Sequence, residues 1–316
     1  MACYHPLKIF YTGRKTETGA KEGIVTRGNS TRISLEWASR KIKNLSWNDT
    51  MKHDENGTAY LDDYDEIPCG KCIGCKLDYS KNWAERCLLE ARYHDSSKFI
   101  TLTYDEDHVP KNGQLSKRDM QLFMKRLRKY TGQQLRFLIC GEIGPATKRP
   151  HYHGIIFGLT LNDEYKWGNF TRSDSLERTW GKGQVIIGQV NFNTCAYVAR
   201  YVVKKQKDDG SFLLMSRRPG IGFRYYMDHR GEMFADGVIY IHTDKGNQMN
   251  IPNYFKYLEK KDNRELLELI SERKKPGIKA QENMKRILNG SNTLNESRAI
   301  EERKATLKQA RYKRPI

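Results

Sequence analysis

The order of apolar segments between residues 98 and 190 restricts the possible folds of this chain more than any other feature. The expected strands cover 98–104, 135–142, 149–158 and 184–190, and the expected helices begin at Ser116 and Ser173. Strand, helix, strand, strand, helix, strand is the split β-α-β pattern of a ferredoxin-like antiparallel sheet. We therefore expect an α+β fold with helices on the sheet faces and the third strand between the first and the second.

Two histidines flank one residue in the third of these strands. Alternate side chains of a strand share a face, so His151 and His153 present their imidazoles side by side. Glu142 ends the preceding strand, and a hairpin through Gly144 and Pro145 would bring its carboxylate to both rings. Two imidazoles and a carboxylate suit Mn²⁺ or Mg²⁺. The alternative is a pair of ordinary hydrogen-bonded histidines.

A short segment carries the spacing Cys-x-x-Cys-x-x-Cys, at Cys69, Cys72 and Cys75. Thiolates this close repel one another unless a soft cation neutralises them, so the segment predicts a structural Zn²⁺ knuckle. We assign the fourth ligand to Cys3, because it lies outside any evident core element, and His5 and Cys87 are the alternatives. An iron–sulfur cluster or three unliganded thiols are the competing interpretations.

The chain is polar and strongly basic. Its 316 residues include 56 Lys and Arg against 38 Asp and Glu, a net charge of +18, and its mean hydropathy is −0.79. Such a charge favours nucleic acid as the partner, although a basic surface can also serve solubility alone. We expect no membrane contact, because no apolar run has the length of a transmembrane helix. With no export signal evident, the seven cysteines are expected to be reduced.

Residues 193–205 predict a helix with two different sides. At about 100° per residue, one side holds Cys195, Val198, Ala199 and Val202, and the other holds Tyr197, Tyr201, Lys204 and Lys205. Tyrosines four residues apart on a helix usually serve packing. Tyrosines that pack on a core would lie on the same side of the helix as Val198 and Val202, and these two do not. We therefore interpret this side as catalytic, with the two tyrosines as nucleophiles and the lysines favouring ionisation of a phenol whose pKa is normally about 10.

The rest of the chain suggests a division into four regions. They are a loop-rich N-terminal elaboration with the knuckle and a helix (1–95), a catalytic core (96–210), a basic and aromatic hairpin region packed on the core (211–252), and charged helices around Pro276 and Gly290 (253–316). The helix of the first region is expected from 78 to 94.

These parts together suggest one reaction. A divalent ion on Glu142, His151 and His153 would polarise a phosphodiester, and a tyrosine oxygen would attack phosphorus. The products would be a 5′-phosphotyrosine link and a free 3′-hydroxyl, and the link would conserve the energy needed to rejoin DNA. A second tyrosine would allow repeated rounds of nicking and transfer.

Three segments resemble the HUH endonucleases, and more closely the replication initiators of gokushovirus-type Microviridae phages. They are Phe99 to Thr103, Arg149 to Gly154, and Tyr197 to Lys205. The resemblance implies rolling-circle replication in the cytoplasm of the host bacterium. It also implies cleavage of single-stranded DNA at the phage origin, with host helicase and DNA polymerase as partners. The alternatives are an HUH relaxase or transposase, and a non-catalytic zinc-knuckle protein that binds nucleic acid.

Overall fold

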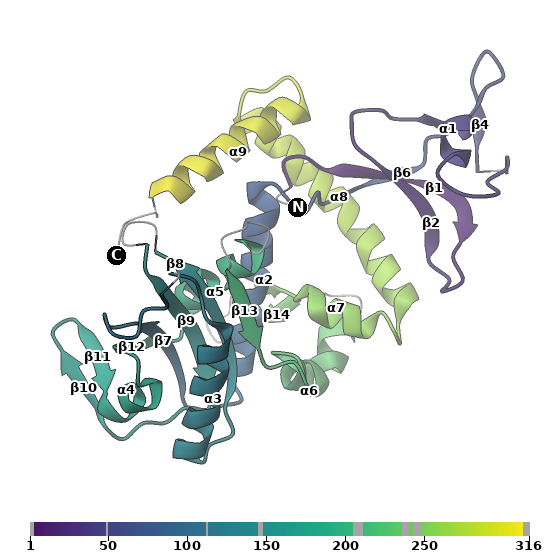
Figure 1. Cartoon of the computed structure of the whole chain (residues 1–316). Helices are drawn as coiled ribbons and strands as arrows, with labels where there is room; N and C mark the ends of the chain where they lie inside the picture. Colours follow the sequence, from purple (N-terminus) through teal and green to yellow (C-terminus); the bar gives the residue numbers. More distant parts are fainter. Residues whose placement is uncertain are drawn as a thin grey trace. The chain divides into compact units, whose positions relative to one another are not determined.

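The fold is described from a computed structural model (Figure 1). It describes residues 3–48, 50–111, 113–144, 148–204, 211–235, 240–242 and 248–311. The chain divides into two compact units. The first combines Met1–Cys75 with Gln281–Tyr312, and the second is built from Lys76–Ala280. The four-region division made from the sequence stays a prediction.

A seven-stranded antiparallel sheet forms the centre of the second unit, in the order β10-β11-β12-β7-β9-β8-β13. In chain order its strands are β7 (Ser97–Thr103), β8 (Arg136–Ile143), β9 (Pro150–Phe157), β10 (Glu164–Trp167), β11 (Phe170–Ser173), β12 (Val185–Gln189) and β13 (Phe212–Met215). The four expected strands are confirmed, and the third, β9, lies between the first and the second. The protein is therefore α+β, with the histidine strand in the middle of its main sheet.

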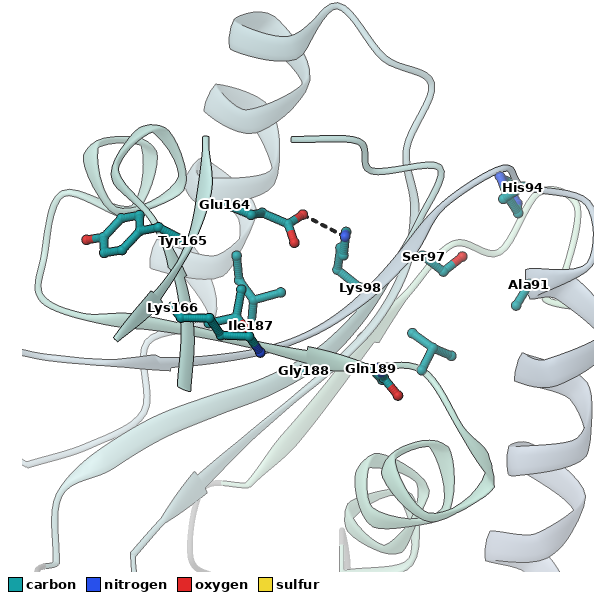
Figure 2. Close-up of a pocket in the computed structure, with 12 residues that line it drawn as sticks. Ala91, His94, Ser97, Lys98, Glu164, Tyr165, Lys166, Ile187, Gly188 and Gln189 are labelled. Carbon is teal, nitrogen blue, oxygen red and sulfur yellow. Dashed lines mark hydrogen bonds and ion pairs between the residues drawn. The ribbon is translucent and has the colours of Figure 1, made fainter. Parts of the chain in front are cut away.

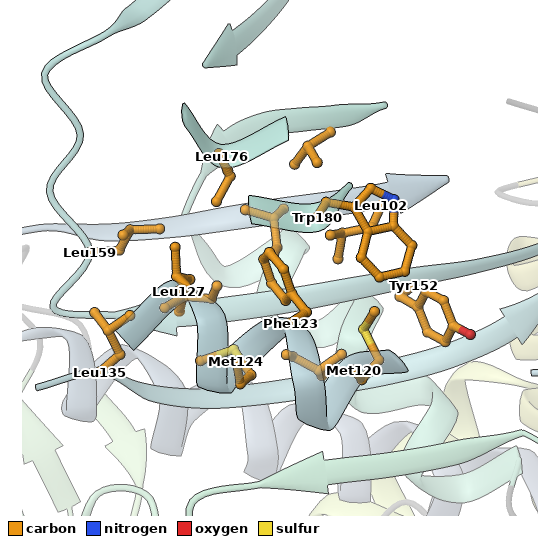
Figure 3. Close-up of a cluster of buried hydrophobic side chains, with 14 of the residues drawn as sticks. Leu102, Met120, Phe123, Met124, Leu127, Leu135, Tyr152, Leu159, Leu176 and Trp180 are labelled. Atoms are coloured by element: carbon orange, nitrogen blue, oxygen red, sulfur yellow. The ribbon is translucent and has the colours of Figure 1, made fainter. Parts of the chain in front are cut away.

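Two pairs of helices cover this sheet. One face packs on α3 (Lys117–Thr131) and α4 (Asp174–Trp180), where Phe123, Leu127 and Trp180 are fully buried (Figure 3). The other face packs on α2 (Ile73–Ala91) and α5 (Phe192–Lys204). Helices α3 and α4 begin where expected. Ser116 caps α3 and Ser173 caps α4, and each side chain accepts a hydrogen bond from the backbone N–H group three residues on. Helix α2 begins at Ile73, inside the cysteine segment, and not near residue 78.

Three strands of the sheet were not expected from the sequence. Strands β10 and β11 form a hairpin between the histidine strand and α4, and β13 pairs with β8 at the other edge. The four residues of β13 are apolar without alternation, so their pattern is equally compatible with a loop. Pairing with a distant strand decided their conformation.

The region after β13 contains a helix where only a hairpin was expected. Helix α6 (Phe223–Phe234) precedes the hairpin of β14 (Tyr240–His242) and β15 (Gln248–Asn250), which does form. These elements share a hydrophobic cluster with α7 (Asn253–Glu259) and the first turns of α8 (Arg264–Leu288). The expected hairpin is thus confirmed, and α6 is an addition to it.

The first unit contains two small antiparallel sheets. One has the order β2-β1-β6 and the other β3-β5-β4. Their strands are β1 (Leu7–Lys15), β2 (Lys21–Thr26), β3 (Ile33–Ser34), β4 (Lys52–His53), β5 (Ala59–Leu61) and β6 (Tyr64–Ile67), with α1 (Leu35–Ser39) beside them. The end of α8 and α9 (Leu294–Arg311) complete the unit. The expected charged helices are confirmed. Pro276, however, lies inside α8, whereas Gly290 separates α8 from α9 with a φ of 61°.

Candidate active site

Strand register brings the three candidate metal ligands of the sheet together. Glu142 on β8 lies directly opposite His151 on β9, and His153 is two residues further along the same face. One ligand atom from each of the three residues lies within 4.8 Å of the others. The hairpin inferred from the sequence therefore does place the carboxylate beside both imidazoles.

Hydrogen bonds orient the two imidazoles toward the carboxylate. The Nδ1 atom of His151 lies 3.1 Å from the carbonyl oxygen of Arg149, and Nδ1 of His153 lies 3.0 Å from Oγ1 of Thr101. A carbonyl only accepts, so Nδ1 of His151 is the donor in this contact. Nε2 of the same ring lies 2.9 Å from Oε1 of Glu142, and Nε2 of His153 lies 3.8 Å from the same oxygen. A carboxylate oxygen only accepts, so a proton on Nε2 or a metal cation would join each ring to Glu142.

The carboxylate of Glu142 has the properties of a metal ligand. The residue is buried, and among the described residues its Oε2 has no hydrogen-bond partner. Burial raises its pKa, but hydrogen bonds and charges from His151 and His153 outweigh this effect and lower the pKa to about 2. The group therefore stays ionised, with one buried oxygen unsatisfied. A divalent cation on these oxygen and nitrogen donors would satisfy both conditions.

Tyr197 on α5 directs its hydroxyl into this cluster. The hydroxyl oxygen lies 3.3 Å from Nε2 of His153 and 3.5 Å from Oε1 of Glu142. The helix buries Cys195 and Val198 against the sheet, as the sequence predicted. Tyr197, which we expected on the opposite side of the helix, is instead half-buried against the same cluster, beside the candidate metal ligands. Burial, followed by the charge of Glu142, raises the pKa of Tyr197 above its usual value. The phenol is thus held neutral beside an anion.

The other candidate residues of this helix are less completely described. Tyr201 and Lys204 lie in the last turn of α5, where the structure describes the backbone but not their side chains. Lys205 lies outside the described residues. The roles of Tyr201, Lys204 and Lys205 stay predictions.

Two aromatic residues support the site in ways that motif spacing did not reveal. Phe99 stacks nearly parallel to the ring of His153, with 6.1 Å between centroids. Tyr152, between the two histidines, points to the opposite face and is fully buried. Its hydroxyl oxygen accepts a hydrogen bond from the backbone N–H of Ser116 at 2.8 Å and lies 2.8 Å from the hydroxyl oxygen of Tyr104. The polar residue in the histidine motif therefore ties this strand to the start of α3.

The first unit contains the second candidate metal site. Its four sulfur atoms lie within 4.8 Å of one another and belong to Cys3, Cys69, Cys72 and Cys75. The Cys3–Cys72 and Cys69–Cys75 sulfurs are each 3.9 Å apart, too far for disulfides. Backbone N–H groups point at the sulfurs, including that of Cys69 toward Cys3 at 3.3 Å. Such a set of thiols matches a tetrahedral structural metal site.

His5 and Cys87, the two alternatives for the fourth ligand of the cysteine site, have contacts elsewhere. His5 pairs with Glu302 at 2.7 Å, and Cys87 is buried in the core between α2 and the sheet.

Burial raises the pKa of Cys69, but N–H groups of Cys72 and Lys71 lower it to about 7 overall. Cys69 therefore has enhanced thiolate character, the form that binds a metal.

No helix in the described parts of the chain is long and apolar enough to cross a membrane. No solved structure gives a significant match to the chain. A family model for replication-associated proteins of the ORF2 type matches residues 97–206, the segment from β7 to the end of α5. That segment contains Glu142, both histidines and Tyr197.

Curated relatives extend this match. Replication-associated protein ORF2 of Spiroplasma virus 4 is 31% identical over 236 residues, covering 68% of this chain and 73% of the relative. Replication-associated protein VP4 of Bdellovibrio phage phiMH2K is 31% identical over 220 residues, covering 63% and 69%. Replication-associated protein ORF4 of Chlamydia phage 1 is 32% identical over 218 residues, covering 62% and 54%. The resemblance to phage replication initiators is thereby confirmed, and the chain belongs to the family of replication-associated proteins represented by these phage proteins.

Proposed function

We propose that this protein nicks and rejoins single-stranded DNA by tyrosine transesterification, and so starts and ends rolling-circle replication of a phage genome. The observation that carries the proposal is the position of the Tyr197 hydroxyl. It lies 3.3 Å from His153 and 3.5 Å from Glu142, in contact with two of the candidate metal ligands. A tyrosine that served only packing would not need its hydroxyl beside a carboxylate and an imidazole.

Each residue of the cluster has a defined task in this proposal. Glu142, His151 and His153 would hold Mn²⁺ or Mg²⁺, which supplies Lewis-acid stabilisation of charge on a phosphodiester. Oγ1 of Thr101 and the carbonyl of Arg149 hold the imidazoles so that both Nε2 atoms face the carboxylate. The pairing strands β7, β8 and β9 keep this arrangement rigid before any DNA binds.

The covalent step exchanges one phosphoester for another. The oxygen of Tyr197 attacks phosphorus, and the bond from phosphorus to the 3′-oxygen breaks. The phenol loses its proton and the departing 3′-oxygen gains one, which leaves a free 3′-hydroxyl and a 5′-phosphotyrosine link. Because the raised pKa of Tyr197 comes from burial and the charge of Glu142, neutralising that charge favours ionisation of the phenol. Reversal of the step rejoins DNA without ATP.

Several finer features belong to the same proposal. The central order β12-β7-β9-β8 supports a ferredoxin-like sheet of the HUH endonuclease type. Tyr201 would act as the second nucleophile, with Lys204 and Lys205 assisting, and the four cysteines would hold a structural Zn²⁺. The protein would act on the phage origin in the bacterial cytoplasm, together with host helicase and DNA polymerase.

The test is formation of a covalent protein–DNA adduct. The full chain is incubated with Mn²⁺ and labelled single-stranded oligonucleotides tiled across the encoding phage genome, and products are separated on a denaturing gel. We expect one tile to give an adduct with the wild type. Tyr197→Phe should abolish the first cleavage, whereas Tyr201→Phe should permit it and block the second transfer.

Tyr130→Phe is the matched control, because Tyr130 is exposed on α3 and contacts none of the cluster residues. It should form the adduct at the wild-type rate. Binding of the tiles without an adduct on any of them would rule out the transesterase and favour the non-catalytic DNA-binding protein.

A further inference from the structure

The β10–β11 hairpin displays three aromatic rings on one face. Trp167 pairs directly with Phe170 and Tyr165 pairs with Arg172, so these four side chains share that face. The exposed fractions are 41% for Tyr165, 53% for Trp167 and 44% for Phe170. Large rings are normally placed where they can be buried, so three on one small exposed surface suggest a binding site.

Arg172 completes this face as a fixed cation. Its guanidinium lies 4.9 Å from the ring centre of Trp167, and Nε and Nη2 each donate to Glu177 at 2.8 Å. The guanidinium is therefore held over one face of the indole, which leaves the other face for a base. A planar cation next to an exposed ring adds to base stacking on aromatic surfaces.

Contacts on both faces of the hairpin tie it to neighbouring elements. Lys98 of β7 pairs with Glu164 at 2.6 Å, and Tyr165 donates to Asp174 at 2.9 Å. Figure 2 shows the ring of Tyr165 pointing away from the Lys98–Glu164 pair. Lys98 and Glu164 line a recess of about 680 Å³. A rigid platform binds a flexible strand at a lower entropic cost than a mobile loop would.

The sheet connects this face to the candidate active site. Strand β11 is three strand positions from β9, which carries His151 and His153. At a spacing of about 4.8 Å between strands, the separation is about 14 Å. One short segment of DNA can therefore reach both places.

We propose that the β10–β11 hairpin is a stacking platform for unpaired bases of single-stranded DNA, about 14 Å from the strand that carries His151 and His153. This inference rests on the proposed function. Stacking on Tyr165, Trp167 and Phe170 supplies affinity that tolerates any base. The net charge of +18 favours DNA, which is a polyanion, over an uncharged protein surface as the partner.

The test separates stacking from charge by comparing two strands. The full chain, without added metal, is titrated with an oligothymidine and with an abasic strand of the same length and backbone charge. We expect Trp167→Leu combined with Phe170→Leu to weaken oligothymidine binding about tenfold, within the range for a stacked base. Binding of the abasic strand should not change.

Trp47→Leu is the matched control, because Trp47 is 49% exposed in the first unit and receives the same substitution. It should bind both strands as the wild type does. Unchanged oligothymidine binding by the hairpin variant would overturn the proposal, and so would an equal loss on both strands. Failure of the adduct assay with wild-type protein is a separate result that concerns the proposed function only.

Discussion

Oγ1 of Thr101 lies 3.0 Å from Nδ1 of His153, across the ladder that joins β7 to β9. The contact leaves Nε2 of His153 facing Glu142 and Tyr197. Partners of this kind fix the orientation of a metal-binding histidine, and their loss typically lowers metal affinity by about 10- to 100-fold. Thr101 is therefore a positioning residue of the candidate metal site.

Thr101→Val should raise the Mn²⁺ concentration needed for half-maximal adduct formation by about tenfold or more. The rate at saturating Mn²⁺ should fall much less, because valine keeps the shape of the strand. The readout is a Mn²⁺ titration of the adduct assay. Thr103→Val serves as the control, since Oγ1 of Thr103 donates to the carbonyl of Gln184 and not to a histidine. Equal Mn²⁺ dependence in both variants would contradict the role of Thr101.

Mn²⁺ should stabilise the folded protein through Glu142. At a free concentration of about 100 times Kd, binding to the native state adds about 2.7 kcal/mol to the free energy of unfolding. Glu142→Gln should lose this gain, because an amide cannot neutralise the cation. The measurement is the thermal midpoint with and without Mn²⁺. Glu106→Gln, with an exposed side chain, should keep the full shift. A shift retained by Glu142→Gln would remove the carboxylate from the metal site.

The buried carboxyl group of Glu85 should make stability depend on pH. Burial raises its pKa to about 7, against the opposing charges of Lys81 and Lys256. Its pKa in the unfolded chain is about 4.3. Between these values the folded state binds more protons than the unfolded state, so stability falls as pH rises.

Glu85→Gln should therefore be more stable than wild type at pH 8, by about 3–4 kcal/mol, and equally stable near pH 4. Urea unfolding at both pH values measures the difference. Glu232→Gln provides the control, because its carboxylate is exposed and should show no such pH-dependent gain. An advantage that is the same at both pH values would indicate a packing effect instead of titration.

The cysteine cluster should hold one Zn²⁺ per chain. Cys3→Ser should lose the metal and lower the unfolding temperature of the first unit, because zinc binding contributes directly to folding. Zinc content by mass spectrometry and a thermal scan provide the two measurements. His5→Ala and Cys87→Ala remove the alternative ligands and should retain zinc. If His5→Ala or Cys87→Ala lost zinc while Cys3→Ser kept it, the fourth ligand would be His5 or Cys87 and not Cys3.

Local patterns in the sequence predicted much of the core. The two-residue period of a strand determines that His151 and His153 share a face, and serine capping marks the first turns of α3 and α4. The expected antiparallel pairing of the two strands does place Glu142 beside His151, while Pro145 of the expected turn lies outside the described residues. These predictions succeeded because each depends on residues close together in the chain.

Only the tertiary structure decided the surroundings of these motifs. Strand β13, helix α6 and the β10–β11 hairpin depend on partners distant in sequence, and their local patterns do not distinguish among strand, helix and loop. The same holds for Tyr197, whose position on α5 followed from helical periodicity, while its contact with Glu142 required the helix to pack on β8 and β9. The sequence by itself determined which side chains share a face. Packing between distant segments determined which of those faces meet, because burial and strand pairing are gained only when the whole sheet assembles.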